Sequence, residues 1–322
     1  MSFTEGLYEQ VISKLLQQEI EAAKSYGKIP QIRAIDQAEA KHIISAYLTS
    51  IIEASLGKIT GTDKKNALDE QIEIANKIIQ LLSDIPANDD VNNLEISDSA
   101  EELLSISPKI KEIPRPETSI SISTLFTGSK LEPSMMSELK REILSSDRID
   151  LIVSFIKWSG LRLIYEELKE FTKTHPLRII TTTYMGATDE KALTKLLELP
   201  NTEIKISYET STTRLHAKSY VFYRDTGFST AYVGSSNISS AALGTGLEWN
   251  VKLTERDMSH IIKIISATFE TYWNSPDFET FTDEKIPELR KALKKERYVG
   301  EDIEYNFQIE PFPFQREVEM LQ

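Results

Sequence analysis

The stretch Leu215-His216-Ala217-Lys218, followed by Gly234-Ser235-Ser236-Asn237 and then by Glu248, decides the fold expected for this chain. It lies in a run from Arg214 to Arg224 that is rich in Tyr, Val and Phe, which is typical of a β-strand. Because side chains alternate between the two faces of a strand, His216 and Lys218 are expected to point the same way.

A second strand-like run, Ser229 to Val233, ends at Gly234, so Asn237 is expected in the turn that follows. A phosphodiester resists attack because its anionic oxygens repel nucleophiles. An enzyme without a metal therefore needs a nucleophile for phosphorus, donors for the non-bridging oxygens and an acid for the leaving oxygen. His216 is the candidate nucleophile, and Glu248 is the candidate acceptor that holds its other ring nitrogen.

The remaining polar residues of this stretch are candidates for binding phosphate. Lys218 and Asn237 are expected to contact the oxygens, and Ser236 and Arg214 to help position the phosphate. A hydrogen-bonded His–Lys pair without chemistry is the alternative, but it does not explain why Asn237 and Glu248 stand at matching positions.

His216-Ala217-Lys218 with the later Gly234-Ser235-Ser236-Asn237 resembles the HKD signature of the phospholipase D superfamily, H-x-K-x4-D with a following G-S-S-N element. The resemblance covers roughly residues 118–275. It implies a phosphohistidine on His216, no metal and no cofactor. The signature fails at one position, where Tyr223 replaces Asp and Asp225 comes two residues late. Nuclease-type members often lack this Asp, so the departure points away from the lipases.

Superfamily members use two HKD motifs, one for the nucleophile and one for the acid, whereas this chain has a single H-x-K. The resemblance therefore implies a homodimer in which two copies of His216 meet at the interface. It also implies a nucleic-acid substrate, with DNA favoured over RNA.

Three further blocks, residues 155–162, 181–189 and 246–250, resemble the phospholipase D-like domain that precedes certain bacterial superfamily-two helicases. Pro313-Phe314-Gln315 resembles the helicase Q motif, whose Gln reads adenine, and a chance Phe-Gln pair is the alternative. No G-x-x-x-x-G-K-[ST] loop occurs in these 322 residues. ATP and Mg are accordingly expected only for a C-terminal helicase part. The setting that this resemblance favours is bacterial defence against phage DNA, with repair as the alternative.

Strands and helices alternate from Ile149 onward. The expected fold is α/β, a phospholipase D-like mixed sheet flanked by helices and preceded by a small all-α domain. Strands are predicted at 149–155, 177–183, 203–208 and 247–253, and helices at 159–172, 188–199, 258–273 and 284–296. The loops after the first two strands carry Lys157 and Tyr184, which are expected to bind substrate.

The N-terminal part is predicted to hold three amphipathic helices, which run from Ser2 to about Tyr26, from Asp36 to Gly57 and from Asn66 to Ser83. The expected domains are 1–113 with a linker, 114–275 as the nuclease domain, and 276–322 as a charged linker and the start of a helicase domain. Packing or dimerisation is the expected role of the helices, with DNA or partner binding as the alternative.

Composition excludes several classes of protein. The chain has no cysteine, and its four histidines are scattered, so disulfides and histidine-based metal sites are not expected. No apolar run is long enough to span a membrane, and a cytoplasmic location is expected. The net charge is −13, yet residues 111–275 carry 20 basic and 20 acidic side chains, so the segment with His216 repels a polyanion least.

Two other functions compete with the nuclease interpretation. One is an inactive module that binds nucleic acid and dimerises beside a helicase. The other, a phosphatidyl-transferring enzyme, is the weakest, because the chain has one motif and no membrane-binding stretch. Trp158 and Trp249 flank the expected site, where they either stack on a base or pack in the core.

Overall fold

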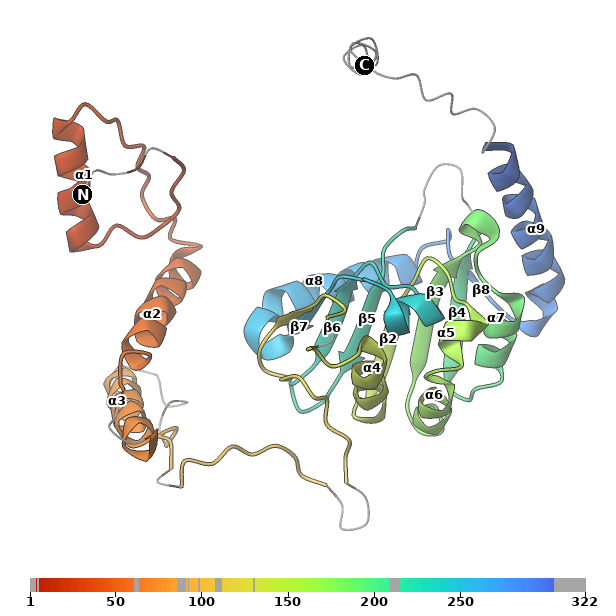
Figure 1. The fold of residues 1–322 in the computed structure, drawn as a ribbon, viewed down its shortest axis with the longest axis horizontal. Helices are drawn as coiled ribbons and strands as arrows, with labels where there is room; N and C mark the ends of the chain where they lie inside the picture. The colour runs from red at the N-terminus through yellow and green to blue at the C-terminus, as the bar shows by residue number, and fades with distance from the viewer. Residues whose placement is uncertain are drawn as a thin grey trace, which may run out of the picture. The chain divides into compact units, whose positions relative to one another are not determined.

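The computed structural model describes residues 4, 6–60, 64–85, 91, 93–97, 99–107, 112–129, 131–208 and 215–303. The chain divides into two units, Met1–Leu104 and Ser105–Gln322 (Figure 1). Arg214 and the Q-like motif at 313–315 lie outside the described residues.

The first unit contains α1 (Lys14–Ser25), α2 (Ala40–Leu56) and α3 (Lys64–Ser83). The prediction of a helix from Ser2 is wrong, because the described residues before Lys14 are not helical. Ser13 caps the helix, and its Oγ accepts a hydrogen bond from the Leu16 amide at 3.1 Å. Gly6, a poor helix former, lies in the predicted first turns.

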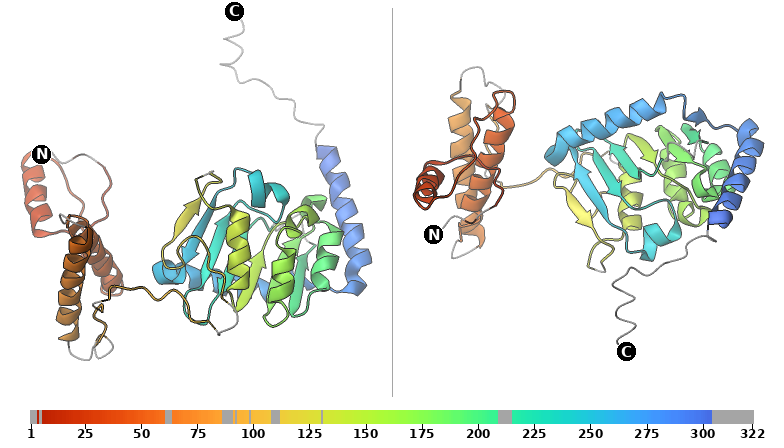
Figure 2. Two further views of the ribbon diagram at one scale, coloured as in Figure 1. Left: turned by 60° about the horizontal axis from the view of Figure 1, so that its bottom comes forward. Right: turned by 90° about the horizontal axis from the view of Figure 1, so that it is seen from above.

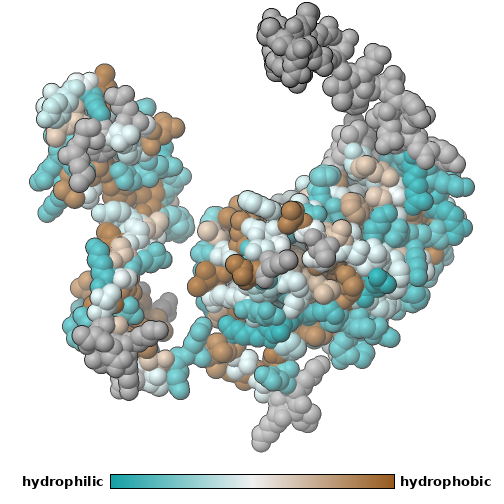
Figure 3. Space-filling model, in the orientation of Figure 1, coloured by the Kyte–Doolittle hydropathy of each residue, from teal (hydrophilic) through white to brown (hydrophobic). Residues whose placement is uncertain are grey.

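This helical unit buries few of its apolar side chains. Of its described residues, Ile20 is the buried hydrophobic one. Ile44, Leu48 and Ile51 of α2 follow helical spacing and are all exposed, and hydrophobic residues colour much of the surface of this unit in Figure 3. The helices α1–α3 therefore carry apolar surface that a partner can cover.

The second unit contains an eight-stranded mixed sheet of order β1-β7-β6-β5-β2-β3-β4-β8. Its strands are β1 (Thr124–Phe126), β2 (Arg148–Ile152), β3 (Leu177–Thr182), β4 (Thr202–Ser207), β5 (Ser219–Tyr223), β6 (Thr230–Gly234), β7 (Asn250–Thr254) and β8 (Glu279–Thr280). Strands β2, β3 and β4 are parallel, and the other neighbouring pairs are antiparallel. The expected mixed α/β fold is confirmed.

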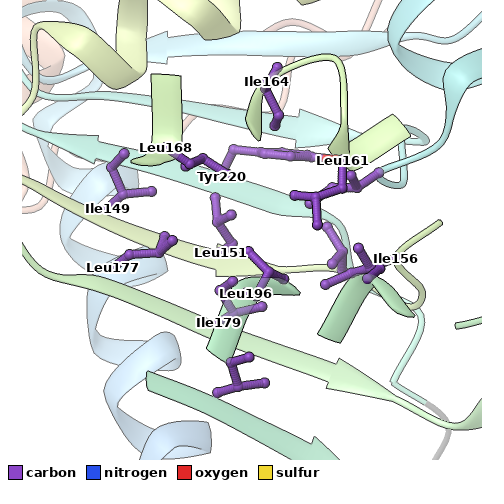
Figure 4. Close-up of a cluster of buried hydrophobic side chains, with 14 of the residues drawn as sticks. Ile149, Leu151, Ile156, Leu161, Ile164, Leu168, Leu177, Ile179, Leu196 and Tyr220 are labelled. Carbon is purple, nitrogen blue, oxygen red and sulfur yellow. The ribbon is translucent and has the colours of Figure 1, made fainter. Parts of the chain in front are cut away.

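Helices cover both faces of this sheet (Figures 1 and 2). They are α4 (Met135–Leu144), α5 (Trp158–Leu161), α6 (Tyr165–Phe171), α7 (Glu190–Leu197), α8 (Glu255–Trp273) and α9 (Ile286–Ile303). The larger core lies under α4 to α7, with Ile149, Leu151, Ile179 and Tyr220 at its centre (Figure 4). On the opposite face, Phe269 of α8 packs on Ile152 and Ile180. The central strands are thus apolar on both faces, as their continuous hydrophobic runs predict.

Two predicted elements differ in the structure. The helix expected over 159–172 is two helices, α5 and α6, separated by a turn in which the Leu163 amide donates to the Gly160 carbonyl and the Ile164 amide to the Leu161 carbonyl. Within α5, the backbone of Gly160 packs closely against Ser239. A Cβ at Gly160 would lie 2.4 Å from the Ser239 Cα. The strand predicted over 149–155 ends at Ile152, which frees residues 153–157 to form a loop.

Helix α4 and the short strand β1 were not predicted. Helix α4 is fixed by a buried ionic cluster rather than by apolar residues alone. The Glu142 carboxylate accepts hydrogen bonds from Arg224 (2.6 Å), Thr230 (2.8 Å) and Tyr232 (2.9 Å), and it pairs with Lys252 at 2.9 Å. These contacts tie α4 to strands β6 and β7 and to Arg224, the residue after β5, and so hold the sheet half that carries the HKD-like residues.

Candidate active site

The HKD-like residues gather at one edge of the sheet. Lys218 immediately precedes β5, whose first residue Ser219 pairs with Ile152 at the carboxyl end of β2. The Gly234 amide at the end of β6 donates to the Lys218 carbonyl at 3.3 Å. His216 and Lys218 therefore lie just before the strand and not within it, which corrects the sequence prediction. The strand begins later because Ser219 is the first residue with a partner on both neighbouring strands.

His216 and Lys218 are in direct contact. The Lys218 Nζ lies 2.9 Å from His216 Nδ1, 3.2 Å from Nε2 and 2.8 Å from the His216 carbonyl oxygen. His216 is exposed, whereas Lys218 is only 6% exposed. Burial lowers the pKa of Lys218, and the nearby Glu248 carboxylate partly opposes that effect.

Glu248 lies close enough to act on two buried groups. Its negative charge counteracts part of the lowering of the Lys218 pKa by burial. At Tyr220, burial raises the pKa most, and the charge of Glu248 raises it further. In the described part of the chain, no hydrogen bond joins Glu248 to His216. Both ring nitrogens of His216 face Lys218 instead.

Asn237 offers a donor to the site. Its side chain is buried, and its Oδ1 accepts a hydrogen bond from the Phe155 amide at 3.1 Å. This bond fixes the amide plane and leaves the Nδ2 hydrogens, for which no bond to a described residue is found. Asn237 can therefore donate to a phosphate oxygen.

Ser236 lies beneath the site. It is fully buried, its Oγ accepts a hydrogen bond from the Asn250 amide group at 2.8 Å, and its carbonyl accepts one from the Tyr220 hydroxyl at 2.9 Å. Ser236 was expected to help position the phosphate, and these contacts place it under the loop that bears Asn237. Asn250 and Tyr220 were not predicted, although Asn250 closes the block at 246–250.

Lys157 and Tyr184 lie in the loops predicted for them. The Lys157 Nζ is 3.4 Å from Asp189 Oδ1, and Asp189 Oδ2 accepts from the Trp158 amide at 2.9 Å. The Lys157 amide donates to the Ile238 carbonyl at 2.8 Å, next to Asn237. Asp189, which was not predicted as a site residue, thereby joins the loops after β2 and β3, and the Lys157 amide joins the loop after β2 to the loop after β6.

Tyr184 lies in the short 3₁₀ turn η2 (Tyr184–Gly186), which packs on α9. Gly186 has φ +58°, and a Cβ there would lie 2.5 Å from the Arg297 Cγ and 2.6 Å from the Leu293 carbonyl oxygen. Arg297 Nε donates to the Gly186 carbonyl at 3.0 Å. Glycine is needed at this position because the backbone is left-handed and the helix is in contact with it.

The two tryptophans beside the site differ. Trp158 packs against the core and meets Tyr165 edge-on, with ring centroids 5.7 Å apart. Trp249 is 63% exposed, so it does not pack in the core. Tyr223, which replaces the signature Asp, donates its hydroxyl to Ser266 of α8 at 3.0 Å and so serves the packing of that helix.

Within the described ranges, no group of three or more His, Asp or Glu side chains is arranged to hold a metal ion. In the same ranges, no helix is long and apolar enough to cross a membrane.

Comparison with known proteins identifies the family. Residues 111–273 match the model described as cardiolipin synthase, PLD-like domain. This match spans half of the chain, and the chain therefore belongs to the phospholipase D superfamily. Membership assigns it to proteins that act on phosphodiester bonds.

Solved structures of low sequence identity align with part of the chain. NucT from Helicobacter pylori is 18% identical, with 47% of this chain and 94% of that chain covered and a TM-score of 0.37. A phospholipase D family member, Nuc from Salmonella typhimurium, is 17% identical, with 50% and 100% covered and a TM-score of 0.39. Yeast tyrosyl-DNA phosphodiesterase 1 is 14% identical, with 33% and 25% covered and a TM-score of 0.24. No curated protein sequence matches this chain.

Proposed function

We propose that this chain is a nuclease that hydrolyses phosphodiester bonds in nucleic acid, DNA above RNA, through a phosphohistidine on His216. The observation that carries the proposal is the contact of His216 with Lys218 beside Asn237, whose amide hydrogens are free to donate. Together they supply a nucleophile, a cation and a neutral donor at one edge of the sheet.

The first step forms a bond between a His216 ring nitrogen and phosphorus and breaks the bond from phosphorus to one ester oxygen. That oxygen leaves with a proton from an acid. In the second step water attacks phosphorus, gives up a proton and releases His216. In the structure, the Lys218 Nζ lies against both ring nitrogens of His216. In the complex it turns to the phosphate oxygens, which frees the ring nitrogen for attack.

The sequence holds one H-x-K motif, so the acid that a second motif would provide has to come from another group. The other histidines, at 42, 175 and 260, lie outside the HKD-like stretch, and His175 stacks on Phe171 with a centroid distance of 5.2 Å. We propose that His216 of a second copy is the acid, so that the active form is a homodimer with the two His216 side chains at the interface.

An apolar surface beside the site suits such an interface. Leu125, Val251 and Val233 are cross-strand neighbours on β1, β7 and β6, and all three are exposed. Leu247 and Trp249 extend this row toward Glu248. We propose that a second copy of the chain covers the row, because the row is apolar and exposed and continues to the residues on either side of Glu248.

A nuclease assay in EDTA tests the catalytic proposal. The wild-type chain should cut DNA with the metal chelated, and His216→Ala should lower the cleavage rate by about 10³-fold or more, since it removes the nucleophile. His260→Ala serves as the control, because that histidine is exposed on α8. A wild type that cuts neither DNA nor RNA would leave an inactive nucleic-acid-binding and dimerisation module as the function. Cleavage that EDTA abolishes would refute the metal-free route.

We further propose that the nuclease acts in the bacterial cytoplasm with a C-terminal superfamily-two helicase domain, in defence against phage. The support is the resemblance of residues 155–162, 181–189 and 246–250 to helicase-linked domains. Phage plating on cells that carry the full-length gene tests this. Equal plaque numbers with wild type and His216→Ala would count against a defence role.

A further inference from the structure

An open groove of about 730 Å³ lies beside the candidate active site. Its walls come from α5, the start of α7 and one side of α9. Five of its lining residues are exposed and basic: Arg162, Lys191, Arg290, Lys294 and Arg297. The surface over α9 is largely hydrophilic in Figure 3.

The carboxylates of the groove leave most of this charge uncompensated. Glu190 binds Arg290 through both oxygens, at 2.6 and 2.8 Å, and Asp189 pairs with Lys157. Arg162, Lys191 and Lys294 also line the groove, and none of them forms an ion pair with a described residue. Three unpaired cations in one groove of a chain with net charge −13 indicate an anionic ligand.

A series of hydrogen bonds joins the groove to the loop that carries Asn237. Trp158 lines it and donates its amide to Asp189, whose other oxygen faces Lys157. The Lys157 amide in turn bonds to Ile238, the residue after Asn237. A polymer held on the catalytic residues can therefore continue into the groove.

The groove also offers an aromatic surface. Lys191 Nζ lies 4.7 Å from the centroid of the Trp158 ring. If Lys191 turns to a phosphate, that ring face is available to an unpaired base. Proteins that bind single strands combine basic grooves with such stacking surfaces.

We propose that this groove binds the backbone of the single nucleic-acid strand that leaves the catalytic residues, with Arg162, Lys191 and Lys294 on its phosphates. The proposal rests on the proposed nuclease function for the presence of a strand in the site. Helix α9, which carries Lys294, lies beyond the segment 111–273 that matches the family model. Because a stacked base on Trp158 has to be unpaired, the groove selects a single strand over a duplex.

Binding of a fluorescent single-stranded DNA to the full chain carrying His216→Ala tests the groove without interference from cleavage. The triple variant Arg162→Glu, Lys191→Glu, Lys294→Glu should weaken binding by about tenfold or more. It should also reduce the slope of log affinity against log salt by about 2, since each lost phosphate contact on a single strand removes about 0.7. The matched control Lys169→Glu, Lys173→Glu, Lys263→Glu makes the same change of net charge on exposed residues outside the groove and should leave the slope unchanged.

Thermal unfolding shows whether each variant is folded before binding is compared. Equal affinities and slopes for the groove and control variants would overturn the proposal, and so would weaker binding confined to duplex DNA. The two proposals fail separately. A wild type that never cleaves refutes the nuclease but leaves the salt slopes in place, and an unchanged slope refutes the groove while cleavage stands.

Discussion

Asn237 shows how a single residue is oriented by the fold. One end of its amide is bound to the Phe155 backbone, so the other end can only donate. The sequence motif predicts that an Asn stands here, but not which atom faces the substrate. The orientation comes from the loop after β2, which is 82 positions away along the chain.

Glu142 is a residue that sequence reasoning did not single out, because an acidic side chain in an amphipathic helix normally faces solvent. Here it is fully buried among Arg224, Lys252, Thr230 and Tyr232. Each of these partners lies at least 82 positions away along the chain. Such a cluster depends on three-dimensional contacts and has no local pattern.

We expect Glu142→Gln to lower the free energy of unfolding by about 3–5 kcal/mol, because it leaves buried cations without their carboxylate. Denaturant unfolding followed by circular dichroism measures the loss. Glu198→Gln is the control, since the Lys195–Glu198 pair is exposed and contributes at most about 1 kcal/mol. A loss for Glu142→Gln no larger than that of the control would contradict the role given to the cluster.

The same carboxylate predicts how stability depends on pH. Burial raises the pKa of Glu142, but Arg224 and Lys252 outweigh burial and hold the pKa below its usual value. A lowered folded-state pKa contributes stability above the unfolded pKa, and that stability is lost as pH falls through the folded value. The difference in stability between wild type and Glu142→Gln should therefore shrink below about pH 4.5.

At the scale of elements, the alternation of strands and helices was predictable, and the ends of strands were not. The apolar run 149–155 continues past Ile152, where pairing with β5 stops. Composition cannot mark that point, because residues 153–156 stay largely buried after leaving the sheet. The same limit explains why His216 was assigned to a strand that begins three residues later.

The close contact between α5 and the turn before η3 (Ala241–Thr245) gives a prediction at this scale. We expect Gly160→Ala to lower the free energy of unfolding by about 1–3 kcal/mol, because its Cβ would overlap the Ser239 backbone. It should also reduce cleavage, since the loops after β2 and β6 hold Lys157 and Asn237. Unfolding and nuclease assays on the same preparation measure both effects. Gly244→Ala, where a Cβ meets nothing within 4 Å, is the control. Equal behaviour of the two variants would contradict this role for Gly160.

At the scale of the whole molecule, we propose that two chains together form one active site. The motif count and the apolar row at Leu125, Val251 and Val233 both favour it. The surface that the second copy would cover could not be predicted from the sequence. Which apolar residues are exposed depends on where each helix packs in the folded chain.

Mixed dimers test this claim. If wild type and His216→Ala are co-refolded in equal amounts, a shared site should leave about a quarter of the wild-type cleavage rate, because a dimer needs two intact histidines. Independent sites would leave about half. The control is an equal mixture of the two proteins assayed directly after mixing without refolding, which should leave about half of the wild-type rate. Light scattering on each sample reports the dimer, and a strictly monomeric, active protein would refute it.

The contact of Gly186 with Arg297 has a mechanical consequence. The left-handed turn at Gly186 is in direct contact with α9 and is also hydrogen-bonded to Arg297. A movement of α9 should therefore shift η2, and with it Tyr184.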